Sequence, residues 1–233
     1  MIFIPLILAH LLGDFLLQPN SWVAAKEKKK LGSVYLYLHV LIHMALVLIF
    51  LWDINLWWIA VIVGVTHFII DGIKLLFQTS KTKRTWFFVD QLLHFAVIAL
   101  LSVVYFPYFR WDDFLNPESL KLITAAVFLS VPSSIIIKTL ISIWTPVTVD
   151  HSKLQTESLV NAGKYIGILE RLLVFVFIIV NHWEGVGFMI AAKSVFRFSD
   201  LAEAKQRKLT EYVLIGTLLS FGIAVITGIL VKI

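Results

Sequence analysis

Long apolar segments recur from one end of the chain to the other, and they limit the possible folds more than any other feature. A helix needs about 20 apolar residues to cross the hydrocarbon layer of a bilayer. Segments that approach or reach this length lie at residues 3–18, 33–52, 55–77, 87–106, 121–144, 165–182 and 209–231. A shorter apolar stretch, 185–198, predicts a short or re-entrant helix. The sequence therefore predicts an all-α, polytopic transmembrane bundle with about seven spans and one short extra helix.

Composition supports this class of protein and excludes others. Hydrophobic residues make up 59% of the 233 residues and charged residues 15%, against about 45–50% and 25% in soluble domains. A disordered chain is excluded, because it needs low hydrophobicity and high charge. The chain has no cysteine, so a disulfide, a thiol nucleophile and a cysteine metal site are excluded as well.

The basic residues predict how the chain is oriented in the membrane. Lysine and arginine gather in the segments 20–32 and 78–86, whereas the connection 53–55 has none. Because basic loops stay in the cytoplasm, both segments are expected inside and the N-terminus outside. The net charge of +5 is explained in the same way. With no basic helix or aromatic sheet module, we expect membrane lipids as partners and no nucleic acid. The oligomeric state is left open.

Histidine and aspartate recur in pairs with i, i+4 spacing in the first four predicted helices. The pairs are His10 and Asp14, His39 and His43, His67 and Asp71, and Asp90 and His94. Residues four apart lie on one face of a helix, so each helix presents two polar groups to the same side. The two H-x-x-x-D motifs indicate a weak internal repeat of two hairpins. We therefore predict a four-helix core at 1–106 and accessory transmembrane helices at 107–233, within a single membrane domain.

Depth and charge favour a metal ion at these pairs. Counted from the predicted inner helix ends at about 1.5 Å per residue, all four pairs fall in the cytoplasmic half. An aspartate at the membrane centre costs about 2.5–3.5 kcal/mol, less nearer the interface, and the sequence indicates few basic partners at this depth. Imidazole and carboxylate ligands suit Zn, Mn, Fe or Ni. We predict one or two divalent ions, with Zn favoured, and the ligands His10, Asp14, His43, His67, Asp71, Asp90 and His94.

Other polar residues suggest further roles at such a site. His39 and Glu170 are the predicted general bases. The predicted substrate-binding residues are Lys74, Arg171, Lys193 and Arg197. For the C-terminal residues the alternative is an intramembrane ion pair that fixes the fold. For the histidines and aspartates the alternatives are hydrogen bonds between helices or a proton relay without metal.

Three motifs carry a resemblance to a known family. H-L-L-G-D-F-L-L-Q at 10–18, H-F-I-I-D-G at 67–72 and D-Q-L-L-H at 90–94 resemble the bacterial integral membrane family DUF3307, whose function is unknown. Three later stretches, 163–171, 191–198 and 211–221, are similar to its longer members. The H-x-x-x-D pattern also has a distant resemblance to DUF457-type membrane-bound metal-dependent hydrolases. These resemblances imply a bacterial inner-membrane protein.

The resulting hypothesis is an integral membrane metalloprotein that hydrolyses a lipid or prenyl-phosphate-type substrate at the cytoplasmic leaflet. A bound metal would activate water and polarise a carbonyl or phosphoryl oxygen. One alternative is a metal-ion or proton-coupled transporter, although the outer halves of helices two to four are almost purely apolar. A second alternative is a non-catalytic scaffold.

Overall fold

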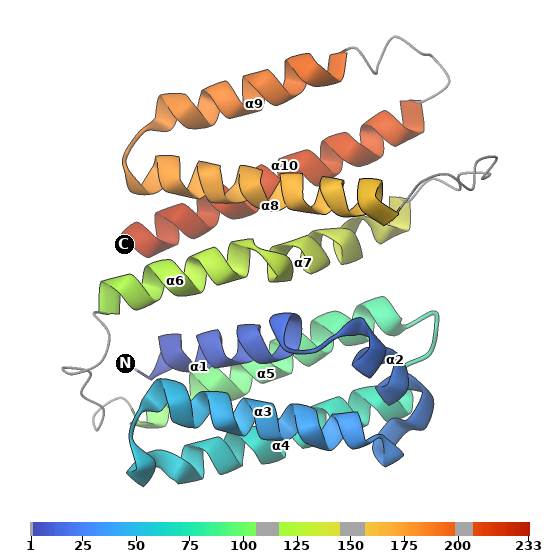
Figure 1. The fold of residues 1–233 in the computed structure, drawn as a ribbon, viewed down its shortest axis with the longest axis vertical. Coiled ribbons are helices and arrows are strands. Elements are labelled where there is room, and N and C mark those ends of the chain that lie inside the picture. Colours follow the sequence, from blue (N-terminus) through green and yellow to red (C-terminus); the bar gives the residue numbers. More distant parts are fainter. Residues whose placement is uncertain (1, 106–116, 145–156, 199–206) are drawn as a thin grey trace. The chain divides into compact units, whose positions relative to one another are not determined.

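In the computed structural model the chain is helical, and the described residues are 2–105, 117–144, 157–198 and 207–233 (Figure 1). No strand occurs in these ranges, which confirms the predicted all-α fold. The chain forms two compact units, Met1–Thr124 and Ala125–Ile233. The first unit contains the predicted metal-site segment 1–106 and continues to Thr124.

Four helices of the first unit form a closed ring. Helix α1 packs against α3 and α5, and α4 packs against the same two helices. The elements of this unit up to residue 105 are α1 (Phe3–Leu11), η1 (Leu12–Leu16), α2 (Asn20–Lys29), η2 (Lys30–Gly32), α3 (Val34–Leu51), η3 (Ile54–Leu56), α4 (Trp57–Phe77) and α5 (Lys83–Tyr105). Because every ring helix has two ring neighbours, each turns one side toward a shared interior.

The interior of this ring is apolar toward one end and polar toward the other. The apolar part consists of the start of α1, the end of α3, the start of α4 and the end of α5. Its buried side chains are Ile2, Leu6, Ala9, Val47, Leu51, Ile59, Ala60, Val63, Ile98 and Leu101. The histidines and aspartates of the four pairs occupy the other part, next to the basic connections.

The burial pattern is that of a protein surrounded by lipid. Large apolar side chains such as Leu41, Val65 and Leu92 are exposed, whereas His39, His67 and many other polar groups are buried. Soluble proteins bury apolar side chains and expose charged ones. Five helical segments are long and apolar enough to cross a membrane: Val34–Leu51, Ile54–Phe77, Lys83–Val104, Pro117–Trp144 and Glu211–Lys232. The chain is therefore an integral membrane protein by composition and helix length.

The number of spans stays a prediction. Five helical segments qualify, or six if the bent pair Phe3–Leu16 and Asn20–Gly32 is one span. Helix α8 (Glu157–Ile179) contains Lys164, Glu170 and Arg171, which keeps it outside this set. Helix α9 (Trp183–Phe198) has 16 residues, in agreement with the short helix predicted at 185–198.

The segment 20–32, expected from its charge to be a loop, forms helix α2 and the short turn η2. Its alanine, lysine and glutamate residues are strong helix formers, and Pro19 ends the preceding helix, because its φ is fixed and it lacks an N–H. A π-helical turn, η1, leads into the bend, and the two helical segments meet at 82°. The chain thus folds α2 back across the polar end of the ring.

The second unit consists of the C-terminal part of α6 (Pro117–Leu129), α7 (Val131–Ile141), η5 (Ser142–Trp144), α8, α9 and α10 (Arg207–Lys232). Helix α8 packs against α7, α9 and α10, and α7 also packs against α10. The predicted helix at 121–144 is broken near Pro132, since α6 ends at Leu129 and α7 starts at Val131. Proline lacks the N–H that would continue the helical hydrogen bonds.

Candidate metal centre

The polar part of the first unit brings together eight imidazole and carboxylate side chains, two from each ring helix and its extension. These are His10 and Asp14 from α1 and η1, His39 and His43 from α3, His67 and Asp71 from α4, and Asp90 and His94 from α5. Seven are buried, and the side chain of Asp14 is 10% exposed. The ring centroid of His67 is 3.9 Å from those of both His43 and His94. The four pairs predicted from spacing therefore form one cluster.

Three donor atoms of this cluster form a nearly equilateral triangle. The Nε2 atoms of His39 and His67 are 3.1 Å apart, and each lies 3.3 Å from Oδ1 of Asp14. A tetrahedral zinc site with bonds of about 2.0–2.1 Å places neighbouring donors roughly 3.3–3.4 Å apart. The triangle thus has the size of one face of such a site. His43 Nε2, 3.0 Å from the same oxygen, is a fourth donor beside it.

The second carboxylate oxygen of Asp14 faces a different partner. Gln91 Nε2 donates to Asp14 Oδ2 at 2.9 Å and lies 3.3 Å from Oδ2 of Asp90. The carbonyl oxygen of the same amide accepts from His10 Nε2 at 3.2 Å. One glutamine therefore holds two carboxylates and one imidazole in position, as groups around metal ligands commonly do. Gln18, four residues after Asp14, has a buried Nε2 without a hydrogen-bond partner among the described residues.

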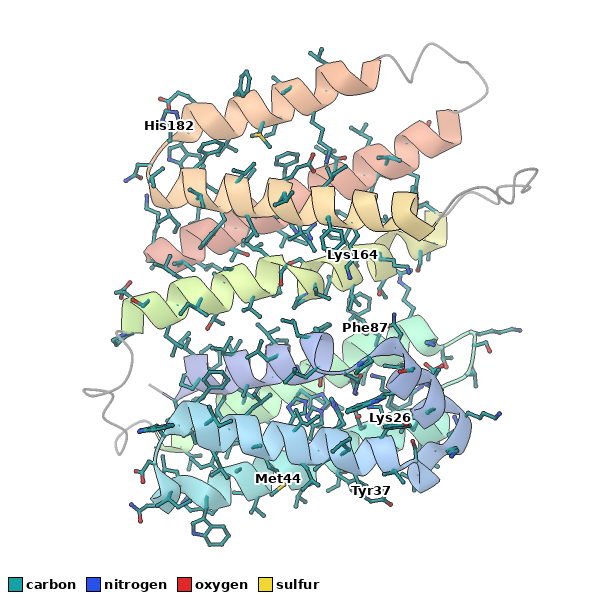
Figure 2. All side chains as sticks on the ribbon, viewed as in Figure 1. Lys26, Tyr37, Met44, Phe87, Lys164 and His182 are labelled. Carbon is teal, nitrogen blue, oxygen red and sulfur yellow. The ribbon has the colours of Figure 1, made fainter. Side chains whose placement is uncertain are left out.

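Two lysines pair with the remaining aspartates, which corrects the expectation of few basic partners at this depth. Lys26 Nζ donates to Asp71 Oδ2 at 2.8 Å, and Lys74 Nζ donates to Asp90 Oδ2 at 2.7 Å. Lys26 comes from α2 and is only 5% exposed (Figure 2). Because α2 folds back over the ring, a residue expected in a solvated loop reaches a buried carboxylate.

The pairing leaves the cluster with one formal negative charge. Three carboxylates, Asp14, Asp71 and Asp90, face the two ammonium groups of Lys26 and Lys74. Among the described residues Asp14 is the carboxylate without a lysine, and it is the one surrounded by three imidazole nitrogens. A buried charge requires a compensating partner. Either a cation or a proton on one of the imidazoles would supply it.

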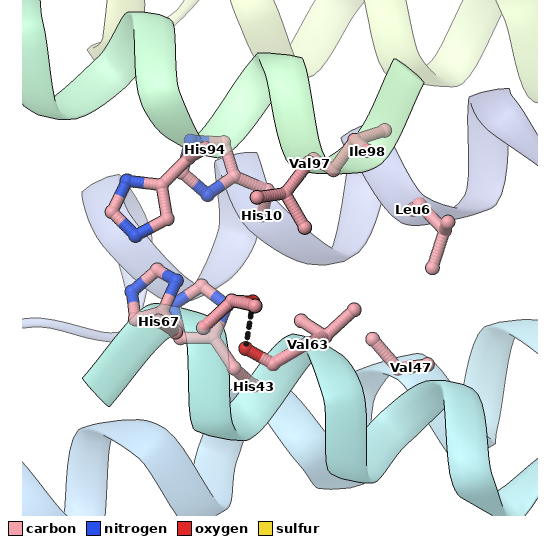
Figure 3. Close-up of a pocket in the computed structure, with 10 residues that line it drawn as sticks. Leu6, His10, His43, Val47, Val63, His67, His94, Val97 and Ile98 are labelled. Atoms are coloured by element: carbon pink, nitrogen blue, oxygen red, sulfur yellow. Dashed lines mark hydrogen bonds between the residues drawn. The ribbon is translucent and has the colours of Figure 1, made fainter. Parts of the chain in front are cut away.

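A small pocket adjoins the imidazoles on the side of the apolar interior. Its volume is about 10 Å³, which is near the lower limit for one water molecule. Figure 3 shows His10, His43, His67 and His94 gathered at one end of it. The far side is lined by the apolar residues Leu6, Val47, Val63, Val97 and Ile98. The cluster is thus closed toward the apolar part of the ring.

The backbone at Gly13 permits a close approach between η1 and α3. A Cβ atom at this position would lie 2.4 Å from Cε1 and Nε2 of His43, a distance at which atoms overlap. Because glycine has no side chain, the His43 ring can lie against the turn and reach Asp14. The contact between His43 and Asp14 therefore depends on a glycine at position 13.

The predicted residues of the C-terminal half have their described contacts within the second unit. Lys193 Nζ donates to Glu170 Oε2, which is the pairing considered as an alternative from the sequence. Lys193 also lies 5.5 Å from the ring centroid of Phe221. The side chain of Arg197 lies outside the described part of the chain. The proposed roles of Glu170, Lys193 and Arg197 in catalysis and substrate binding stay predictions.

Arg171 stabilises the break between α6 and α7. Its guanidinium donates to the carbonyl oxygens of Leu129 and Ser130 at 2.7 and 3.1 Å, and to the hydroxyl groups of Ser134 and Ser220 at 2.5 and 3.2 Å. Carbonyl groups at a helix end lack partners inside the helix. Arg171, only 3% exposed, supplies those partners. Four hydrogen bonds leave little donor capacity for a substrate phosphate.

Residues of the site that sequence reasoning missed come from the turn and the back-folded helix. Lys26 was used only to orient the chain, because it lies among four closely spaced lysines. The available signal was Trp22, four residues earlier, whose ring stacks on Tyr35 at 5.2 Å and marks the face of α2 that contacts the ring helices. Gly13 lies in the motif at 10–18, but the sequence alone gave no reason to assign it a role.

The ring of four helices with a buried cluster of histidines and aspartates defines a polytopic helical membrane protein with a polar centre of metal-ligand type. The family described as "Protein of unknown function (DUF3307)" matches residues 2–122, about half of the chain and nearly all of the first unit. The chain belongs to this family, as its motifs indicated. No curated protein and no solved structure matches the chain.

Proposed function

We propose that the cluster binds a divalent metal ion, with Zn²⁺ favoured, and that the protein is a membrane-embedded metal-dependent hydrolase. The observation that carries this proposal is the triangle formed by Asp14 Oδ1, His39 Nε2 and His67 Nε2, with edges of 3.1–3.3 Å. Three donors at that spacing from three different elements, two of them from fully buried side chains, match the ligand number of catalytic zinc sites, which keep one position open. The unpaired charge of Asp14 adds the attraction for a cation.

The metal would supply Lewis-acid chemistry and an activated water. In this arrangement His39 acts as a ligand, in place of the general base predicted from the sequence, because its Nε2 is one corner of the triangle. Asp71 Oδ2, 3.8 Å from His39 Nε2 and bonded to Lys26, lies beside this corner of the triangle without a hydrogen bond to it. His10 and Gln91 hold the carboxylate of Asp14. Lys74, whose side chain is 24% exposed, is the cation best placed to meet an anionic substrate.

The proposed location is the bacterial inner membrane, with the N-terminus outside and the site open to the cytoplasmic leaflet. The basic residues of α2 and of the connection at 78–82 lie at the polar end of the ring, which the positive-inside rule assigns to the cytoplasm. A site at this depth meets lipid head groups more readily than soluble molecules. This position supports a lipid or a prenyl-phosphate-type molecule as the proposed substrate.

The transporter hypothesis is less well supported by the same structure. An ion that crosses the membrane through the first unit would have to pass the apolar interior formed by Leu6, Val47, Val63 and Ile98. Removing an ion from its ligands into such surroundings is costly. The hydroxyl groups of Thr66 and Ser102, which lie beyond the imidazoles, donate to carbonyl oxygens of their own helices. A site reached from one side favours an enzyme.

The metal content of the full-length protein in detergent tests the proposal. Protein prepared without chelator is analysed by ICP-MS beside Asp14→Asn, His39→Ala and His67→Ala, with His182→Ala as a control. His182, in the turn between α8 and α9 (Figure 2), has a 61% exposed side chain. We expect at least one equivalent of metal in the wild type and the control, and none in the three variants. Wild-type protein that holds no metal after incubation with Zn²⁺ and Mn²⁺ would overturn the proposal.

A further inference from the structure

The carboxylate of Asp14 has two oxygens with different surroundings. Oδ1 faces the Nε2 atoms of His39, His43 and His67 at 3.0–3.3 Å. Oδ2 lies on the side of α5, where Gln91 donates to it. Asp90 is the residue directly before Gln91. A carboxylate in this position can bind one ion through each oxygen. Ions bridged in this way in two-metal sites lie about 3.5–4 Å apart.

The α5 side of Asp14 contains two buried polar atoms without a hydrogen-bond partner among the described residues. They are Oδ1 of Asp90 and Nε2 of His94, and both residues are at least nine-tenths buried, with 1% and 4% exposure. An unsatisfied buried polar group costs about 1–3 kcal/mol. These two atoms lie near a third acceptor, the carboxylate of Asp14, which pairs with no lysine among the described residues.

The tautomer of His94 makes its free nitrogen a ligand. His94 Nδ1 lies 2.8 Å from the backbone carbonyl oxygen of Asp90, and a carbonyl accepts but does not donate. Nδ1 therefore carries the proton, and the buried Nε2 of the neutral ring has a free lone pair. Metal-bound histidines commonly donate their other N–H to a backbone carbonyl in this way. Ligand atoms of Asp14, Asp90 and His94 all lie within 4.8 Å of one another.

We propose that Asp14, Asp90 and His94 hold a second divalent cation, bridged by the Asp14 carboxylate to the ion at His39 and His67. This inference rests on the proposed function, since the first ion shares Asp14. Lys74 and Gln91 contact Oδ2 of Asp90, so Oδ1 is available to the second ion without disturbing either contact. The two-ion centre then uses ligands from all four ring helices.

Two divalent ions also narrow the substrate class to phosphate esters of lipids. The cluster's one negative formal charge becomes three positive charges when both ions are bound, and a dianionic phosphate group compensates most of that charge. Two metal ions about 4 Å apart stabilise both the attacking and the leaving oxygen in displacement at phosphorus. In the reaction, water adds to phosphorus, the P–O ester bond breaks, and the lipid alcohol leaves with a proton. The products are an alcohol and inorganic phosphate.

Manganese binding tests the two-ion centre directly. Metal-stripped, full-length protein in detergent is titrated with MnCl₂, and bound Mn²⁺ is counted and examined by EPR. We expect two Mn²⁺ per chain with an exchange-coupled spectrum, and one Mn²⁺ with an uncoupled spectrum in Asp90→Asn and in His94→Ala. The His182→Ala control should keep two. If the variants fail to fold, the wild-type stoichiometry and coupling decide the question alone.

The outcomes separate this inference from the proposed function. One uncoupled Mn²⁺ in the wild type, retained in Asp90→Asn and His94→Ala and lost in His39→Ala, would overturn the second site and leave the first. No bound ion in the wild type would remove both. For the substrate class, phosphate release is measured from a diacylglycerol phosphate and a polyprenyl monophosphate in mixed micelles. We expect release from at least one and a loss of at least 100-fold in Asp90→Asn. No release from either lipid would overturn the assignment to phosphate esters.

Discussion

The two units of the chain differ in how completely their buried charged groups are paired. In the second unit, the guanidinium of Arg171 is surrounded by two carbonyl and two hydroxyl groups, all of which accept hydrogen bonds from it. In the first unit, three carboxylates meet two ammonium groups, and the buried atoms Asp90 Oδ1 and His94 Nε2 have no hydrogen-bond partner among the described residues. The contacts of Arg171 are nearly complete, whereas those of the cluster are not.

This difference gives a criterion for separating structural from functional polar groups inside a membrane protein. Burial and rarity do not distinguish them, since Arg171 and Asp90 are both almost fully buried. The balance of donors and acceptors does. A group whose hydrogen bonds are satisfied by the protein stabilises the fold, whereas a surplus of acceptors around one carboxylate calls for a ligand. The following predictions test this comparison.

Replacement of Asp14 by asparagine should have the largest effect. Asp14 Oδ1 contacts three histidines, so its loss removes the central ligand and the unpaired negative charge. We expect the affinity for Zn²⁺ to fall by at least 1,000-fold, or about 4 kcal/mol, while the helical content measured by circular dichroism is kept. Competition with a fluorescent zinc chelator measures the affinity. An unchanged affinity would place the ion elsewhere in the molecule.

Replacement of Arg171 by alanine should destabilise the second unit without affecting metal content. The carbonyl oxygens of Leu129 and Ser130 lose their donors, and hydrogen bonds to charged groups are worth about 1.5–3 kcal/mol each. Because the acceptors can regain part of these hydrogen bonds from other donors once the structure relaxes, we expect a net loss of roughly 2–4 kcal/mol in the free energy of unfolding. Unfolding in mixed detergent micelles measures it. Loss of the metal from the folded variant would contradict the separation of the two roles.

Replacement of Lys26 by methionine should destabilise the protein mainly when no metal is bound. Asp71 would lose its buried partner. Breaking such a pair costs about 3–5 kcal/mol when the remaining charge has no other partner, and because Asp71 still lies 3.8 Å from His39 Nε2 we expect a loss of roughly 2–3 kcal/mol. The cluster would gain a second uncompensated negative charge, so Zn²⁺ should stabilise this variant more than the wild type. Thermal unfolding with and without Zn²⁺ measures both effects. Lys28→Met, at an exposed position of the same helix, is the control and should show neither.

Replacement of Gly13 by alanine should have the smallest of the four effects. The new Cβ would overlap the His43 ring, so His43 must shift away from Asp14. We expect the affinity for Zn²⁺ to fall by about 10- to 30-fold, or roughly 1.4–2 kcal/mol. Gly222→Ala is the matched control, because nothing lies within 4 Å of a Cβ at that position. Equal affinities in the two variants would show that the approach of η1 to His43 does not matter.

Much of the first unit followed from local patterns in the sequence. The apolar segments predicted the ring helices within a few residues, and the i, i+4 pairs predicted which residues meet, because helix periodicity fixes the faces. The break between α6 and α7 also has a local cause, because Pro132 lacks the N–H that a continuous helix needs. These features depend on residues close together in sequence. They could therefore be derived without knowing the tertiary structure.

The contacts that depend on the 82° bend could not be derived in this way. Lys26 and Asp71 are 45 positions apart, and only the direction of α2 after the bend brings them together. The triangle of donors, which favours His39 as a ligand over a base, depends on side-chain positions that spacing alone does not determine. The structural role of Arg171 could be recognised only from the positions of the Leu129 and Ser130 carbonyl groups to which it donates.

The back-folded helix α2 also has a consequence for the time scale of ion exchange. Under the proposed function, an ion that enters from the polar end would meet the ion pairs Lys26–Asp71 and Lys74–Asp90, and we expect it to displace at least one lysine before it reaches the imidazoles. Entry and release are then limited by the opening of α2 or of the Lys74 contact, and an ion once bound exchanges slowly. The half-time for removal of the ion by EDTA would therefore report how often this end of the ring opens. A shorter half-time in Lys26→Met than in the wild type would identify α2 as the barrier.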